Sequence, residues 1–169
     1  MKRIGIFYGS TTGNTEKIAK KIRSNLEAGL VDIYNVKDAN IIDVEKYENI
    51  ILGSSTWGVG ILQSHFEEFL HKVLKQANLK NKKIAIFGTG DSTLYPESFA
   101  DSIGVIFEAL EGKGVSFVGE FPTDGYHFDT SLSIFRDKFV GLPLDDDSDE
   151  EQNKFRISIW TDLLKLDMN

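Results

Sequence analysis

The sequence predicts an α/β fold of three layers, in which a doubly wound parallel sheet of five strands lies between two layers of helices. Short apolar runs, suited to strands buried on both faces, alternate with amphipathic helical patterns along the whole chain. Glycine and hydroxyl-bearing residues directly follow three of these apolar runs. The length of 169 residues suits one hydrophobic core, so residues 1–169 are expected to form a single domain.

Five strands are expected. Three continuous apolar runs predict central strands: Ile4–Tyr8, Ile50–Leu52 and Ile84–Phe87. The run Leu30–Val36 is more polar and predicts an edge strand. Val115–Val118 begins a fifth strand, and Phe139–Leu142 resumes it. We therefore expect an insertion at about 120–138 that splits strand five, a loop longer than compact domains usually carry without a reason.

Apolar side chains at helical spacing predict helices between these strands. The apolar stripes are Ile18, Ile22 and Leu26; Phe66, Phe69, Leu70, Val73 and Leu74; Phe99, Ile103, Phe107 and Leu110; and Ile157, Trp160 and Leu164. A further short helix is expected within 39–47. Strand followed by helix, repeated five times, favours right-handed crossovers in a parallel sheet.

The loop after the first strand has the composition of a phosphate site. It runs directly into a helix and consists of Ser10, Thr11, Thr12, Gly13, Asn14 and Thr15. Hydroxyl and amide groups at a helix N-terminus form a nest of neutral donors. The loop contains no Lys or Arg, which separates it from the Walker P-loop, and it lacks the Gly-x-Gly-x-x-Gly pattern. A hydroxyl-rich helix cap is the alternative interpretation.

Two more loops place aromatic residues at the same edge of the sheet. After strand three, Trp57 lies between small polar residues and Gly58, a glycine that lets its peptide reorient at low cost. After strand four, the segment 88–97 offers backbone amides and Tyr95. Ligands of doubly wound sheets bind beyond the carboxyl ends of the strands. A phosphate nest, two aromatic plates and a backbone pocket together predict a site for flavin mononucleotide (FMN).

These motifs resemble the flavodoxin family over essentially the whole chain. The first loop resembles its signature Thr/Ser-x-Thr-Gly-x-Thr, and residues 56–64 and 88–95 resemble its two flavin loops. The 122–126 segment and the acidic run at 145–151 resemble the long-chain subfamily. The resemblance implies the strand order 2-1-3-4-5. It implies FMN contacts from Ser10, Thr11, Thr12, Gly13, Asn14, Thr15, Ser55, Thr56, Trp57, Gly58, Val59, Gly60, Thr89, Gly90, Asp91, Tyr95 and Asp147.

The resemblance implies a low-potential one-electron carrier, with no catalytic residue and no metal. A carbonyl of the Gly58–Val59 peptide is expected to support the one-electron-reduced flavin (semiquinone). Negative charge from Asp91 and the 145–151 run is expected to oppose full reduction. Much of that run is otherwise expected to be a solvated surface and a helix N-terminus.

The overall composition limits the classes of partner that the protein is expected to bind. A net charge of −7 argues against nucleic acid and anionic membrane, and favours redox partners with basic docking faces. The resemblance implies a ferredoxin/flavodoxin–NADP reductase, a pyruvate oxidoreductase or a nitrogenase system. No cysteine occurs, which excludes disulfides and thiolate-ligated clusters. No apolar run reaches the roughly 18 residues of a membrane span, so a cytoplasmic location is expected. The protein is also expected to be a monomer.

Three alternatives are less favoured by the sequence. The first is an FMN-dependent NAD(P)H:quinone reductase of related fold. The second is a signalling receiver, which would need a phospho-acceptor aspartate after strand three, where Gly53-Ser54-Ser55-Thr56 stands. The third is a module that has lost its flavin.

Overall fold

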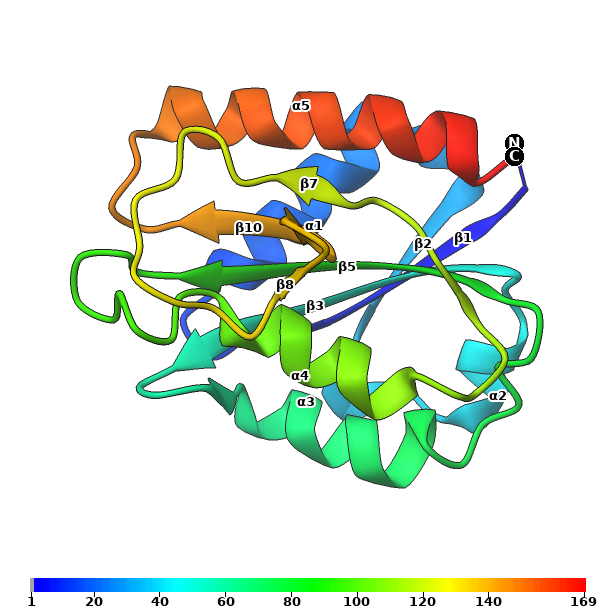
Figure 1. The fold of residues 1–169 in the computed structure, drawn as a ribbon. Coiled ribbons are helices and arrows are strands. Elements are labelled where there is room, and N and C mark those ends of the chain that lie inside the picture. The colour runs from blue at the N-terminus through cyan, green and yellow to red at the C-terminus, as the bar shows by residue number, and fades with distance from the viewer. Residues whose placement is uncertain (1) are drawn as a thin grey trace.

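A computed structural model describes residues 2–169. Its central sheet contains five parallel strands in the order β2-β1-β3-β5-β10 (Figure 1). Their bounds are β1 Ile4–Gly9, β2 Val31–Asn35, β3 Asn49–Trp57, β5 Lys83–Gly90 and β10 Leu142–Asp145. The order is second, first, third, fourth and fifth strand along the chain, so the expected 2-1-3-4-5 topology is confirmed.

Helices cover both faces of this sheet. In Figure 1, α1 (Asn14–Asn25) and α5 (Glu150–Asp167) lie on one side, and α3 (Ser64–Phe69) and α4 (Asp101–Leu110) lie on the other. The short α2 (Ile41–Glu45) lies within the expected 39–47 range. Two single turns of 3-10 helix, Ala28–Leu30 and Val36–Asp38, flank β2. The helix begun by α3 continues as a π-helix over Leu70–Leu74. Within residues 2–169, no helix has the length and apolar character needed to cross a membrane.

The core lies where the apolar runs of the sequence predict it. Every residue of β1 is buried, as are Ile50–Leu52 of β3 and Ile84–Phe87 of β5. The central strands are covered on both faces, which is why they carry continuous apolar runs and not alternating ones. From α5, Trp160 is fully buried with its ring centroid 6.4 Å from that of Phe87.

Two central strands extend further than predicted. The sequence places a loop at 54–60, but β3 continues to Trp57 and turns into the antiparallel β4 (Ile61–Leu62), with Thr56 opposite Leu62. Likewise, β5 continues to Gly90 through residues expected to form a loop. Ladder pairing with neighbouring strands, Ser55 with Thr89 among them, holds these polar residues extended. Local composition carries no signal for such pairing.

The fifth strand is split, as expected. Its first piece, β6 (Ser116–Phe117), pairs with the start of β5, and β10 pairs with the end of β5. The position predicted for the second piece, Phe139–Leu142, is wrong, because the strand begins at Leu142. Phe139 instead belongs to a small antiparallel sheet inside the insertion, in the order β7-β9-β8. Its strands are β7 Phe121–Pro122, β8 Ile134–Phe135 and β9 Lys138–Phe139.

Aromatic side chains explain why this insertion is ordered. Phe139 is fully buried, with its ring centroid 5.0 Å from Tyr126 and 5.5 Å from Phe128. The Tyr126 hydroxyl donates to the carbonyl of Pro143 (2.6 Å), which ties the insertion to β10. The Arg156 guanidinium lies 3.9 Å from the Tyr126 ring centroid. The insertion therefore has a core of its own, joined to the main one.

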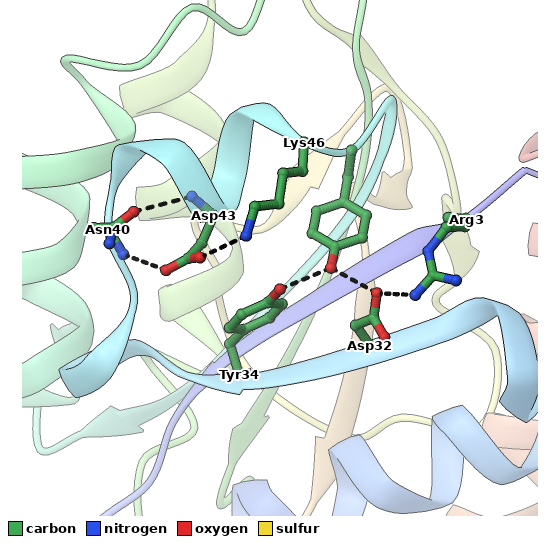
Figure 2. Close-up of polar contacts among 7 residues, drawn as sticks. Arg3, Asp32, Tyr34, Asn40, Asp43 and Lys46 are labelled. Carbon is green, nitrogen blue, oxygen red and sulfur yellow. Dashed lines mark hydrogen bonds and ion pairs between the residues drawn. The ribbon is translucent and has the colours of Figure 1, made fainter.

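A polar network lies at the corner between β1, β2 and α2 (Figure 2). The Tyr47 hydroxyl donates to Asp32 (2.6 Å) and is hydrogen-bonded to the Tyr34 hydroxyl (2.8 Å). Arg3 donates to the same Asp32 oxygen at 2.5 Å. The Tyr47 hydrogen bond, followed by the Arg3 one, lowers the pKa of Asp32, and burial raises the pKa of Tyr47. Beside them, Asn40 and Asp43 form a reciprocal capping box on α2 (Figure 2).

Candidate cofactor-binding site

A pocket of about 180 Å³ lies at the carboxyl edge of the sheet. It brings together residues from the first loop, the end of β3, the end of β5 and the segment after β10. Its lining consists of Thr11, Thr12, Asn14, Thr15, Ser55, Thr56, Trp57, Thr89 and Asp146. Hydroxyl and amide groups dominate this lining, and no Lys or Arg belongs to it. The structure therefore brings residues of the first two predicted loops together with Thr89, whereas Asp91 and Tyr95 do not belong to the lining.

The first loop is shaped by its own hydrogen bonds. The Gly13 amide donates to the Ser10 hydroxyl (3.0 Å), and Gly13 has a φ of 90°. This turn delivers the chain into α1, whose first residues are Asn14 and Thr15. No side chain caps α1. The first amides of that helix therefore have no side-chain acceptor, and two of its first residues, Asn14 and Thr15, line the pocket.

The hairpin between β3 and β4 presents the first aromatic side chain. Trp57 is the last residue of β3 and is 43% exposed. Two glycines with positive φ form the turn after it, Gly58 at 49° and Gly60 at 71°. Between them, Val59 is 79% exposed. Thr56 accepts a hydrogen bond from the amide of Ser102 (3.0 Å), which anchors the end of β3 to the start of α4.

The loop after β5 presents the second aromatic side chain. Thr89 and Gly90 are buried in the strand, and Asp91 begins the turn. The Asp91 carboxylate accepts hydrogen bonds from the amides of Thr93 (3.0 Å) and Leu94 (2.9 Å), so it organises this turn. The turn leaves Tyr95 41% exposed. Within residues 2–169, neither Trp57 nor Tyr95 pairs with another aromatic ring.

The acidic run at 145–151 is not solvent-exposed throughout, as had been expected for much of it. Asp145 is only 4% exposed and accepts hydrogen bonds from the amides of Ser92 (3.1 Å) and Asp147 (3.0 Å). Only the later part of the run matches the expected helix N-terminus, with Asp149 as the cap of α5. The buried position of Asp145 follows from its place at the end of a sheet strand, which sequence reasoning had set at Leu142.

Asp146, which sequence reasoning missed, is the carboxylate in the pocket lining. Asn14 donates to it from the first loop (3.3 Å). Its side chain is open to solvent on one side, yet desolvation, followed by the charges of Asp91 and Asp145, raises the pKa of Asp146. The structure places Asp147 in a separate depression, together with Ser92 and His127. Only the bend after β10 decides which of two adjacent aspartates faces the pocket.

Gln63 is a second residue that sequence reasoning left out of the site. Its side chain is fully buried and donates to the Thr11 hydroxyl (3.1 Å), directly behind the pocket. Its place in the stretch Leu62-Gln63-Ser64, directly before α3, was the only signal in the sequence.

Comparison with known proteins agrees with this geometry. The flavodoxin family profile matches residues 6–160. Flavodoxin from Synechocystis is 40% identical over 98% of this chain and 97% of its own. Flavodoxin from Buchnera aphidicola of Baizongia pistaciae is 40% identical over all of this chain and 98% of its own.

Solved structures give the same result. Fusobacterium nucleatum flavodoxin bound to flavin mononucleotide superposes with a TM-score of 0.92 at 32% identity, covering 99% of each chain. A short-chain flavodoxin superposes with a TM-score of 0.66 at 16% identity, which shows the fold alone. With a matching profile over most of its length and full-length relatives at 40% identity, this chain belongs to the flavodoxin family.

Proposed function

We propose that this protein binds FMN without a covalent bond and carries single electrons between redox enzymes. The observation that carries the proposal is the pocket at the carboxyl edge, which has hydroxyl and amide groups and the half-exposed Trp57 in its lining and no Lys or Arg. The half-exposed Tyr95 lies in the loop after β5. The F. nucleatum relative is bound to the same cofactor. When bound, the flavin supplies the one-electron chemistry, and the protein adjusts its potential.

The donor set fits FMN. A phosphate monoester offers only acceptor oxygens, and the pocket offers hydroxyls, the Asn14 amide and the first amides of α1. At about 180 Å³ the pocket suits the phosphate and sugar-alcohol chain, and a three-ring system must lie outside it. We assign the ring to the space bordered by Trp57 and Tyr95. Residues 10–15, 55–60 and 89–91 would supply the remaining contacts, with Asp146 or Asp147 near the sugar-alcohol hydroxyls.

The charge of the site favours a low potential. No Lys or Arg belongs to the pocket lining, and desolvation, followed by the charges of Asp91 and Asp145, raises the pKa of Asp146. Carboxylates that repel one another's negative charge would also repel the negative charge of a fully reduced, anionic cofactor.

We also propose that residues 1–169 are one FMN-binding domain of the long-chain type, acting as a monomer in the cytoplasm. The ordered insertion that splits strand five supports the long-chain assignment. The net charge of −7 supports partners with basic docking faces, such as a ferredoxin/flavodoxin–NADP reductase, a pyruvate oxidoreductase or a nitrogenase system.

One experiment tests the core of this proposal. The purified protein is reconstituted with FMN, and its visible absorption is followed during an anaerobic reductive titration. We expect bound flavin that is reduced in two separated one-electron steps. Protein that stays colourless after incubation with FMN contradicts the proposal. Rapid oxidation of NADPH by the protein alone would instead support the quinone-reductase alternative.

A further inference from the structure

The buried side chain of Gln63 links the first loop to α3. Its Oε1 accepts a hydrogen bond from the amide of Phe66 (2.9 Å) and so caps the helix. Its Nε2 donates to Thr11 Oγ1 (3.1 Å) and lies 3.4 Å from His65 Nδ1. Its backbone amide donates to the Ser54 hydroxyl (3.2 Å). Every polar atom of this side chain therefore has a partner, as a buried amide requires.

These partners settle which way the Gln63 amide faces. The backbone amide of Phe66 can only donate, so the oxygen of Gln63 must face it and the NH₂ group must face Thr11. Thr11 Oγ1 is then an acceptor in this bond. The hydroxyl hydrogen of Thr11 points elsewhere, and the side chain lines the pocket. Gln63 thus leaves the Thr11 hydroxyl to act as a donor toward whatever the pocket holds.

The neighbouring backbone is built to hold this arrangement. A Cβ at Gly9 would lie 2.3 Å from Gln63 Oε1 and 2.9 Å from the Cβ of Phe66. Only glycine at the end of β1 leaves room for the Gln63 side chain. On the other side, Gln63 Nε2 lies 3.4 Å from His65 Nδ1, and exchanging the amide oxygen and nitrogen would break the hydrogen bond from Phe66.

We propose that Gln63 is a positioning residue that makes FMN the preferred flavin over riboflavin, which lacks the phosphate. It does so by fixing the Thr11 hydroxyl as a donor to the phosphate, with His65 holding the other amide hydrogen. This inference rests on the proposed function. A phosphate has no hydrogen to donate at the dianion stage, so a loop hydroxyl helps only when its own hydrogen faces the ligand.

The first test is the variant Gln63→Glu, which keeps the size of the side chain and the oxygen that caps α3. When ionised, its second oxygen can only accept, so it takes the Thr11 hydrogen and reverses the bond. We expect affinity for FMN to fall at least about tenfold, as for a lost hydrogen bond to a charged group, while affinity for riboflavin changes less than about twofold. Quenching of flavin fluorescence on titration with apoprotein measures both affinities. The exposed Gln76→Glu is the matched control, since it adds the same charge away from the pocket.

A second variant separates hydroxyl orientation from the added charge. Thr11→Val removes the hydroxyl at an exposed position without changing the size of the side chain. We expect it alone to lower the FMN-to-riboflavin affinity ratio about tenfold. In the Thr11→Val background, Gln63→Glu should cost a clearly smaller factor, because only its charge then acts.

The outcomes are distinguishable. Wild-type protein that binds neither flavin overturns the proposed function itself. Wild-type protein that binds both flavins equally keeps a flavin site but overturns the role of Gln63 in selectivity. Equal losses for FMN and riboflavin in Gln63→Glu, or equal factors in the two Thr11 backgrounds, also overturn it. If Gln63→Glu does not fold, as judged by thermal unfolding of the apoprotein, an unchanged affinity ratio in Thr11→Val still refutes the inference.

Discussion

Gly58→Ala tests whether the turn after β3 helps to set the flavin potential. Gly58 has a φ of 49°, and a Cβ built on it meets nothing within 4 Å. The substitution therefore adds no collision, and its whole effect is conformational. A left-handed residue other than glycine costs about 1–2 kcal/mol, so the free energy of unfolding should fall by that amount.

The effect of Gly58→Ala on reduction depends on a second conformation of this turn, in which the 58–59 peptide is rotated. Turning the 58–59 peptide by about half a rotation at positive φ moves residue 58 into a region open essentially only to glycine, at a cost of about 1–3 kcal/mol. The expected contact between the carbonyl of this peptide and a bound, one-electron-reduced flavin would require this rotation. The shift in potential is set by the difference between this cost and the cost already present in the resting turn, about 1 kcal/mol. Since 1.4 kcal/mol corresponds to roughly 60 mV for one electron, the first reduction step should become more negative by on the order of tens of millivolts. The yield of the one-electron-reduced form should fall accordingly.

Gly112→Ala is the matched control for this variant. Gly112 has a φ of 81° and open space around its Cβ position, and it lies just after α4, away from the pocket. Both variants should lose similar stability in urea unfolding, and only Gly58→Ala should shift the potentials in an anaerobic titration. If both lose stability but neither shifts the first potential, the proposed peptide rotation is refuted.

Three more predictions follow from buried or clustered polar groups. Burial raises the pKa of Asp101, so the stability of the wild-type protein should fall as pH rises from the usual aspartate range through that raised pKa. Asp101→Asn removes the titrating group and should remove this loss. In urea unfolding the variant should therefore gain stability relative to wild type across that pH window, and the difference should vanish below it. Tyr47→Phe removes a hydroxyl that donates to Asp32 and should cost about 1–3 kcal/mol of unfolding free energy without changing FMN affinity, whereas weakened binding would mean that this corner supports the site. Asp146→Asn should make the second reduction step less negative by on the order of tens of millivolts, with a smaller shift for Asp147→Asn; equal shifts in redox titration would argue against a special place for Asp146.

Much of the fold can be predicted from local patterns, since burial on both faces of a strand demands apolar residues in sequence. Ile4–Tyr8 and Ile84–Phe87 are continuous apolar runs, and both are buried strands. Strand ends are harder to predict. Ser55 and Thr56 look like loop residues, but pairing with Thr89 and Leu62 keeps them in β3. Phe139 looks like the start of a sheet strand, but it packs into the core of the insertion.

The amino-acid sequence by itself determined that hydroxyl groups, a glycine and the first residues of a helix follow β1. It also determined that Trp57 and Tyr95 lie at or after the ends of two neighbouring strands. Topology then places all of them at one edge, because the strands are parallel. Only the tertiary structure decided which side chains face inward there. Asp146 lines the pocket and its neighbour Asp147 does not, because the chain bends where Asp145 becomes buried. Gln63 reaches Thr11 across 52 residues only because β1, β3 and α3 pack together, and no pattern of neighbouring residues encodes that contact.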